Sequence, residues 1–75
     1  MLKLADRVDE ALQVLVAALD RNRESGDLAL EIGMCFSAKA EFDRAEEAYR
    51  QAIKIDPRNA QAYLSLGILL EQANQ

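Results

Sequence analysis

Few side chains in this sequence could do chemistry. It contains one cysteine, Cys35, and no histidine. Because no base stands beside Cys35 to lower the pKa of its thiol, we interpret this residue as a small apolar core residue. The carboxylates Asp43, Glu46 and Glu47 are close in sequence, but neither the spacing nor the glycine turn of a calcium loop accompanies them. The sequence therefore predicts no catalysis, no metal site and no cofactor.

The length and charge of the chain exclude several classes of protein. Its 75 residues predict one small domain, too short to bury a large core around an elaborate catalytic cleft. A net charge of -4 opposes nucleic-acid binding, which needs Lys and Arg to neutralise phosphates. No apolar run approaches the roughly 18 residues of a membrane span, so no membrane insertion is expected. One free cysteine and no export signal predict a cytoplasmic location.

Four segments show the spacing of apolar residues that is typical of amphipathic helices. We expect an all-α fold with helices over Leu2–Asn22, Leu28–Lys39, Phe42–Ile55 and Ala60–Ala73. The stretch Ser25-Gly26-Asp27 is predicted to separate the first two helices. Pro57 cannot continue the third helix, and Asn59 is the expected N-cap of the fourth. Because the connections are short, neighbouring helices should pack antiparallel as hairpins.

The sequence repeats itself with a period of 34 residues. This shift aligns Leu30 with Leu64, Gly33 with Gly67, Ala11 with Ala45, Leu15 with Tyr49 and Ala18 with Ala52. Glycine inside a helix costs about 1 kcal/mol relative to alanine, so two glycines at one phase need a structural reason. The repeat therefore predicts that a neighbouring helix comes close to the backbone at Gly33 and Gly67.

These spacings resemble those of the tetratricopeptide repeat family, which is characterised by W-x2-L-G-x2-Y, then A-x3-F, then P. The residues at the matching positions are Ala29, Ile32, Gly33, Phe36, Ala45, Tyr49, Ala52 and Pro57, followed by Tyr63, Leu66, Gly67 and Leu70. Ala29 departs from the large aromatic residue of the family, and Arg23 stands where an earlier proline is usual. The resemblance implies antiparallel helix hairpins stacked as a short right-handed superhelix of about four helices.

The resemblance also implies how the single domain, residues 1–75, is divided. Residues 1–25 correspond to the second helix of a partial repeat, residues 26–59 to a complete repeat, and residues 60–75 to the first helix of a following partial repeat. Tyr49 and Tyr63 fall at the large packing positions of the family. We therefore interpret both tyrosines as core residues rather than ligand-binding residues.

Members of this family bind proteins or peptides mainly in a concave groove lined by the first helices of the repeats. Carried over to this chain, that face consists of Asp27, Leu30, Met34, Ser37, Gln61, Leu64, Ile68 and Glu71. Its centre is apolar, which suits an apolar peptide or an amphipathic helix of a partner protein. The alternative is that this face packs against other protein, in the same chain or in a second copy.

Some members of the family clamp the acidic C-terminal tails of chaperones with lysine, arginine and asparagine. The matching positions of this chain are Leu30, Met34 and Ser65, none of which offers a cation or an amide. Burying a carboxylate there would leave its charge unpaired. We therefore expect no binding of acidic C-terminal chaperone tails.

In this family each first helix packs against the second helix of the same repeat, so the leading and trailing helices of this chain lack partners. The apolar side chains expected to be uncovered are Val8, Leu12, Leu15, Leu19, Tyr63, Leu66, Leu69 and Leu70. Uncovering about 300 Å² at about 25 cal/mol per Å² forfeits several kcal/mol. Either a longer chain covers both ends, or residues 60–73 of one copy complete the unit begun by residues 6–22 of another; a monomer with frayed terminal helices is the remaining possibility.

Two functions follow from these patterns. The leading one is a protein-interaction module that binds an apolar peptide or helix in its groove without catalysis. The other is a self-assembling structural unit, a homo-oligomer in the form of a closed dimer or a head-to-tail array, in which terminal helices complete a repeat between chains.

Overall fold

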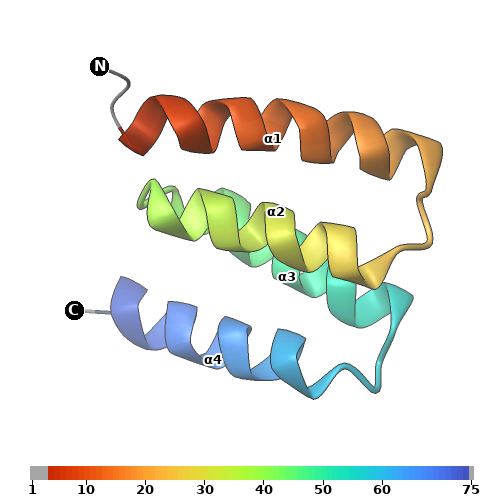
Figure 1. Cartoon of the computed structure of the whole chain (residues 1–75). Coiled ribbons are helices and arrows are strands. Elements are labelled where there is room, and N and C mark those ends of the chain that lie inside the picture. Colours follow the sequence, from red (N-terminus) through yellow and green to blue (C-terminus); the bar gives the residue numbers. More distant parts are fainter. Residues whose placement is uncertain (1–3, 75) are drawn as a thin grey trace.

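A computed structural model describes residues 4–74, and the side chains of residues 7–74. Its four helices are α1 (Leu4–Arg21), α2 (Gly26–Ala38), α3 (Phe42–Ile55) and α4 (Ala60–Ala73). Each helix runs antiparallel to the one before it, and together they form a slab of 40 × 36 × 16 Å (Figure 1). The predicted all-α fold of antiparallel hairpins is confirmed, whereas the predicted start of the first helix at Leu2 lies outside the described residues. Among those residues, no helix has both the length and the apolarity to span a membrane.

The start of α2 differs from the sequence prediction. We expected Ser25-Gly26-Asp27 to separate the first two helices, but Gly26 and Asp27 belong to the first turn of α2. The prediction was wrong because Ser25 is an N-cap: its hydroxyl accepts a hydrogen bond from the Leu28 amide at 3.3 Å. Gly26 also stands beside α3, since a β-carbon built on it would lie 3.5 Å from the Ala52 carbonyl oxygen.

The two remaining connections follow simple turn chemistry. Pro57 lies just beyond the end of α3, and the Asn59 side chain accepts a hydrogen bond from the Ala62 amide at 3.2 Å, as predicted for an N-cap. Between α2 and α3 the backbone turns through Ala40, whose φ of 61° lies in the left-handed region. The Glu41 amide then donates to the Phe36 carbonyl at 2.9 Å and closes this turn.

The pair α2–α3 forms the centre of the molecule, because α1 packs on α2 and α4 packs mainly on α3. One buried cluster joins α2, α3 and α4, and it consists of Ala29, Leu30, Ala45, Tyr49, Ala52, Ala62 and Leu69. A second cluster joins α1, α2 and α3, and it consists of Leu12, Ile32 and Ala48. Each outer helix is therefore held by apolar contacts with the central pair.

An ion-pair network ties α1 to the turn between α2 and α3. The Lys39 ammonium pairs with the Asp9 carboxylate of α1, and it lies 3.3 Å from a carboxylate oxygen of Glu41. The hydrogen bond with Asp9 is the main reason that the pKa of Lys39 lies above its ordinary value. Because these groups are solvent-accessible, the pairs orient α1 more than they stabilise it.

Gly33 permits the closest approach between α2 and α3. A β-carbon built on Gly33 would lie 2.5 Å from two carbons of the Tyr49 ring, which real side chains do not tolerate. Tyr49 is only 3% exposed, so its ring has little room to move away. The expected close approach is therefore present at Gly33. At Gly67 nothing lies within 4 Å of the corresponding position, because no described helix covers that side of α4.

This difference predicts opposite effects of the same substitution. Gly33→Ala should lower the free energy of unfolding by about 1–3 kcal/mol, because the new methyl group overpacks the buried Tyr49 ring. Gly67→Ala should raise it by about 1 kcal/mol, because alanine is the better helix former and meets no neighbour. Urea unfolding followed by far-UV circular dichroism at low protein concentration measures both. Equal effects of the two variants would contradict the assigned packing.

Candidate peptide-binding groove

A hollow of about 320 Å³ lies between α2 and α4. Its walls and floor are formed by Met34, Ser37, Ala38, Tyr49, Ser65, Ile68, Leu69 and Gln72. Tyr49 of α3 is the lining residue that comes from neither α2 nor α4, and at 3% exposure it lies at the floor. α3 packs against both of these helices (Figure 1). Met34 and Ile68 are 45% and 47% exposed, so both offer apolar surface to a ligand. We call this hollow the α2–α4 groove.

The predicted groove residues have different places in the structure. Met34, Ser37 and Ile68 line the α2–α4 groove together. Asp27, Gln61, Leu64 and Glu71 are exposed but do not line the hollow. Leu30 is only 5% exposed and belongs to the core cluster, so its surface is not available to a ligand.

Leu30 and Leu64 show why the family position alone does not decide exposure. The two leucines occupy the same phase of the repeat, yet Leu64 is 64% exposed. Leu30 belongs to a buried cluster to which α3 and the following helix, α4, both contribute. No described helix follows α4, and Leu64 therefore remains open. We infer that this position packs between successive first helices whenever both are present.

The sequence prediction missed five of the residues that line the groove. Ser65 and Gln72 follow Leu64 and Glu71 directly, and they share the spacing i, i+3, i+7 with Ile68, so a wider stripe would have included them. Ala38 extends the α2 wall in the same way. Tyr49 and Leu69 contribute from the core, and no sequence pattern separates such a floor from an ordinary buried residue.

The side chains that line the α2–α4 groove are all uncharged. No lysine, arginine, aspartate or glutamate belongs to its lining. Burial raises the pKa of the Tyr49 phenol above its ordinary value, and the neighbouring Ser37 hydroxyl opposes part of that rise. The phenol is therefore protonated at neutral pH. The arrangement suits apolar side chains accompanied by backbone or hydroxyl hydrogen bonds, not a charged ligand.

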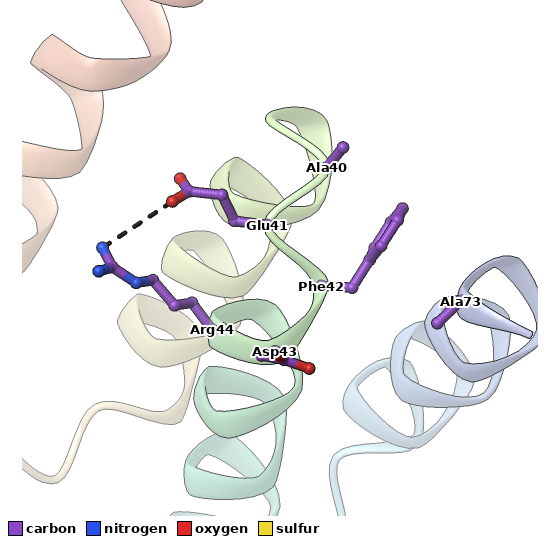
Figure 2. Close-up of a pocket in the computed structure, with 6 residues that line it drawn as sticks. All are labelled: Ala40, Glu41, Phe42, Asp43, Arg44 and Ala73. Carbon is purple, nitrogen blue, oxygen red and sulfur yellow. Dashed lines mark ion pairs between the residues drawn. The ribbon is translucent and has the colours of Figure 1, made fainter.

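A second cavity, of about 470 Å³, lies between the start of α3 and the end of α4 (Figure 2). It is lined by Ala40, Glu41, Phe42, Asp43, Arg44 and Ala73. Arg44 lies 3.9 Å from a carboxylate oxygen of Glu41, and its guanidinium also stands 5.9 Å above the Phe36 ring. Arg44 and Glu41 are thus paired with each other at this cavity, and within residues 4–74 no cluster of acidic, histidine or cysteine residues suits a metal ion.

The residues predicted for self-association separate into three groups by exposure. Leu12 and Leu69 are 8% and 2% exposed, because they pack into the two core clusters of their own chain. They are therefore not available to a second copy. Tyr63 and Leu70 are 51% and 37% exposed. The remaining predicted residues are half-buried, namely Val8, Leu15, Leu19 and Leu66.

The arrangement defines a class of protein, a helical-repeat scaffold. Its helices pack at alanine and glycine residues that recur every 34 residues. Residues 38–74 match the family described as TPR repeat. This match confirms the resemblance to the tetratricopeptide repeat family over those residues. Repeats of this family mediate interactions between proteins.

Curated relatives contain similar segments. Over 44 residues the chain is 41% identical to RNA polymerase-associated protein CTR9 of Caenorhabditis elegans. The matched segment is 59% of this chain and 4% of that protein. It is 38% identical over 45 residues to the protein CTR9 homolog of Arabidopsis thaliana, and this segment is 60% of this chain and 4% of that protein. Over 69 residues it is 26% identical to the probable UDP-N-acetylglucosamine–peptide N-acetylglucosaminyltransferase SPINDLY of Hordeum vulgare. This segment is 92% of this chain and 7% of that protein. The chain thus spans less than a tenth of the length of these relatives.

The environment of Cys35 predicts a slow thiol. Burial raises the pKa of the thiol above its ordinary value, and the nearby Glu31 carboxylate raises it further. At neutral pH, alkylation by iodoacetamide should be slower than that of free cysteine, on the order of several-fold, because only the thiolate reacts. In urea the rate should return to that of free cysteine. A rate for the folded protein that equals or exceeds that of free cysteine would contradict this.

Proposed function

We propose that the chain is a protein-interaction module whose α2–α4 groove binds an apolar segment of a partner protein. The observation that supports this most directly is the pair Met34 and Ile68. Both side chains are about half exposed, and they line one hollow from two successive first helices. Leaving two large apolar side chains in water is unfavourable, so their burial by a ligand contributes favourably to binding.

The dimensions of the groove limit what it takes. Its volume of about 320 Å³ stands at the low end of the range of about 300–1,000 Å³ for small-molecule sites, and the hollow is open. We therefore propose that it receives one or two apolar side chains of a peptide or an amphipathic helix laid across α2 and α4. Ser37, Ser65 and Gln72 are the residues that hydrogen-bond the polar edges of such a segment.

The proposed function does not include catalysis. The SPINDLY relative bears the name of a transferase, but the matched segment is 7% of that protein, so the transferase activity is not transferred to this chain. The same applies to the RNA polymerase association in the name of CTR9, because the match covers 4% of it. The division into residues 1–25, 26–59 and 60–75 is proposed on the same family grounds, and the cytoplasmic location stays a prediction.

Labelling of the methionine methyl groups with carbon-13 tests the groove directly. The sequence contains two methionines, so Met34 reports from the groove with little spectral overlap. A synthetic amphipathic peptide with leucines three and four residues apart should shift the Met34 signal in a saturable way, with a dissociation constant on the order of 10–100 µM. The physical reason is burial of the Met34 and Ile68 side chains.

Matched variants separate the groove from the rest of the surface. Met34→Lys and Ile68→Lys should weaken binding of this peptide by about tenfold or more, because each places a charge where apolar surface is buried. Val16→Lys is the control, since Val16 is also 45% exposed but lines a different cavity against α3. Equal affinities for the three folded variants would place the site elsewhere.

A peptide that ends in several acidic residues is expected to remain unbound. No lysine or arginine lines the groove, so a carboxylate entering it would lose its hydration without gaining a cation. Isothermal titration with such a peptide should show no saturable heat at protein concentrations up to about 1 mM. Micromolar affinity that survives moderate salt would contradict the neutral groove.

A further inference from the structure

α4 has an apolar face that is buried in the preceding repeat unit but open here. On α2 this face packs against α3 and consists of Ala29, Ile32, Gly33 and Phe36. The residues 34 positions later on α4 are Tyr63, Leu66, Gly67 and Leu70. Tyr63 is 51% exposed where Ala29 is 1% exposed, and Gly67 faces open space where Gly33 faces a ring. Among residues 4–74, Leu66 is half-buried against the core cluster of its own chain, whereas Tyr63, Gly67 and Leu70 are exposed. We call these four residues the α4 end face.

α1 has a complementary face that is only partly covered, with Val14 exposed and Ala11, Leu15 and Ala18 half-buried. The residues of α3 that pack against α2 are Ala45, Ala48, Tyr49 and Ala52, each at most 9% exposed. The residues 34 positions earlier on α1 are Ala11, Val14, Leu15 and Ala18, which we call the α1 end face. Val14 is 69% exposed where Ala48 is 9% exposed. The chain thus contains both halves of a helix pair like α2–α3, but on two helices that do not contact each other.

We propose that the α4 end face of one copy binds the α1 end face of a second copy and reproduces the α2–α3 contact between chains. The register follows from the intrachain pair, in which Gly33 meets Tyr49 and Gly26 lies close to Asp56. Shifting the first of these contacts by one repeat places Leu15 of one copy over Gly67 of the next. Gly67 is open to receive it, since nothing lies within 4 Å of the position of its missing β-carbon.

The shapes of the two end faces fit this register. In an antiparallel pair centred on Gly67 and Leu15, Tyr63 is level with Leu19, and Leu70 is level with Leu12. The neighbouring residues on the α1 end face are Ala18 and Ala11, so a small side chain of that face lies beside each large one of α4, an alternation that lets two helices interdigitate. Gly67 is the one small residue of the α4 end face, and Leu15 of α1 lies opposite it in this register.

The charges also favour a second copy as the occupant. Neither end face contains a charged residue, so the two faces themselves bring no like charges together, and the carboxylates Glu10 and Glu71 flank one end of the junction. Antiparallel docking brings the exposed Arg7, one turn before Ala11, toward the end of α4 that contains Glu71. A cation near the C-terminal end of a helix is favourable, and α4 has no basic residue of its own in its last turn.

The positions of the two faces decide between a closed dimer and an open array. α1 and α4 are the outermost helices at opposite ends of the stack and do not contact each other (Figure 1). Each end face is the side of its helix that the rest of the chain leaves at least partly uncovered, so we infer that the two faces point away from each other. A single partner therefore cannot occupy both faces of a slab of this shape. The association is head to tail, and a contact of this type that does not close generates an open chain of copies.

One helix pair makes a small interface, below the roughly 1,200 Å² of stable complexes, so association should be weak and concentration-dependent. Sedimentation velocity from about 10 µM to about 1 mM should show an average mass that rises beyond two copies without reaching a plateau. Added salt should strengthen the association, because it screens the repulsion between acidic chains. A folded protein that stays monomeric throughout would overturn the proposal, and so would a mass that stops at two copies.

Two variants each block one end face. Gly67→Arg places a long side chain where Leu15 of the next copy must lie, and Val14→Arg places one on the opposite face. Either variant alone should be monomeric at all concentrations. An equimolar mixture should form a dimer and stop there, because each variant retains the face that the other needs. Association of either variant alone, or the absence of a dimer in the mixture, would overturn the proposed register.

The controls separate a blocked face from a damaged fold. Gly67→Arg replaces glycine by a better helix former on an exposed face, so its midpoint of thermal unfolding at low concentration should not fall below that of the unaltered chain. Val16→Arg is the matched surface control, because Arg50 stands at the same phase of α3 with its side chain 61% exposed. Val16→Arg should assemble like the unaltered chain, and its failure to do so would point to general charge repulsion instead.

Discussion

The approach of Gly33 to Tyr49 is the contact on which the rest of the structure depends. It lets α2 and α3 pack with a large aromatic ring against bare backbone, so that the ring is only 3% exposed. The two outer helices are then held by residues of this pair. α1 places Leu12 against Ile32 of the central pair, and α4 places Leu69 in the cluster that contains Tyr49. Separating α2 from α3 would therefore divide both buried clusters, since each contains residues of both central helices.

The fold could be predicted largely from the sequence because its determinants are local and repeat. The apolar spacing, Pro57 and the Asn59 cap locate helices without any knowledge of tertiary contacts, and the period of 34 residues locates the close approach at Gly33. The prediction of where α2 begins failed because glycine and serine occur both in loops and at the starts of helices. Glycine and serine are typical of loops, but Ser25 caps α2 and Gly26 stands in its first turn beside α3.

The candidate site was less predictable because exposure depends on which helices are neighbours, not only on phase within the repeat. Leu30 and Leu64 are equivalent in sequence, yet the first lies in a buried cluster to which α4 contributes, and no described helix follows the second. Met34 and Ile68 occupy another shared phase and are exposed to nearly the same degree. A groove residue can therefore be recognised as one that stays exposed in successive repeats, whereas a residue at an end face changes from buried to exposed.

The groove and the end faces use different sides of α4, so ligand binding and head-to-tail association are compatible. If α1 of a second copy covers the α4 end face, then α2 of that copy becomes the next first helix along the stack. Leu64 would then be buried as Leu30 is in the cluster to which α4 contributes, which removes the most exposed leucine of α4 from water. The α2–α4 grooves of successive copies would lie in one row, and a partner with several apolar segments would gain affinity from binding them together. A weak interface between copies is sufficient for this purpose, because a multivalent ligand adds its own contacts to both sides of each junction.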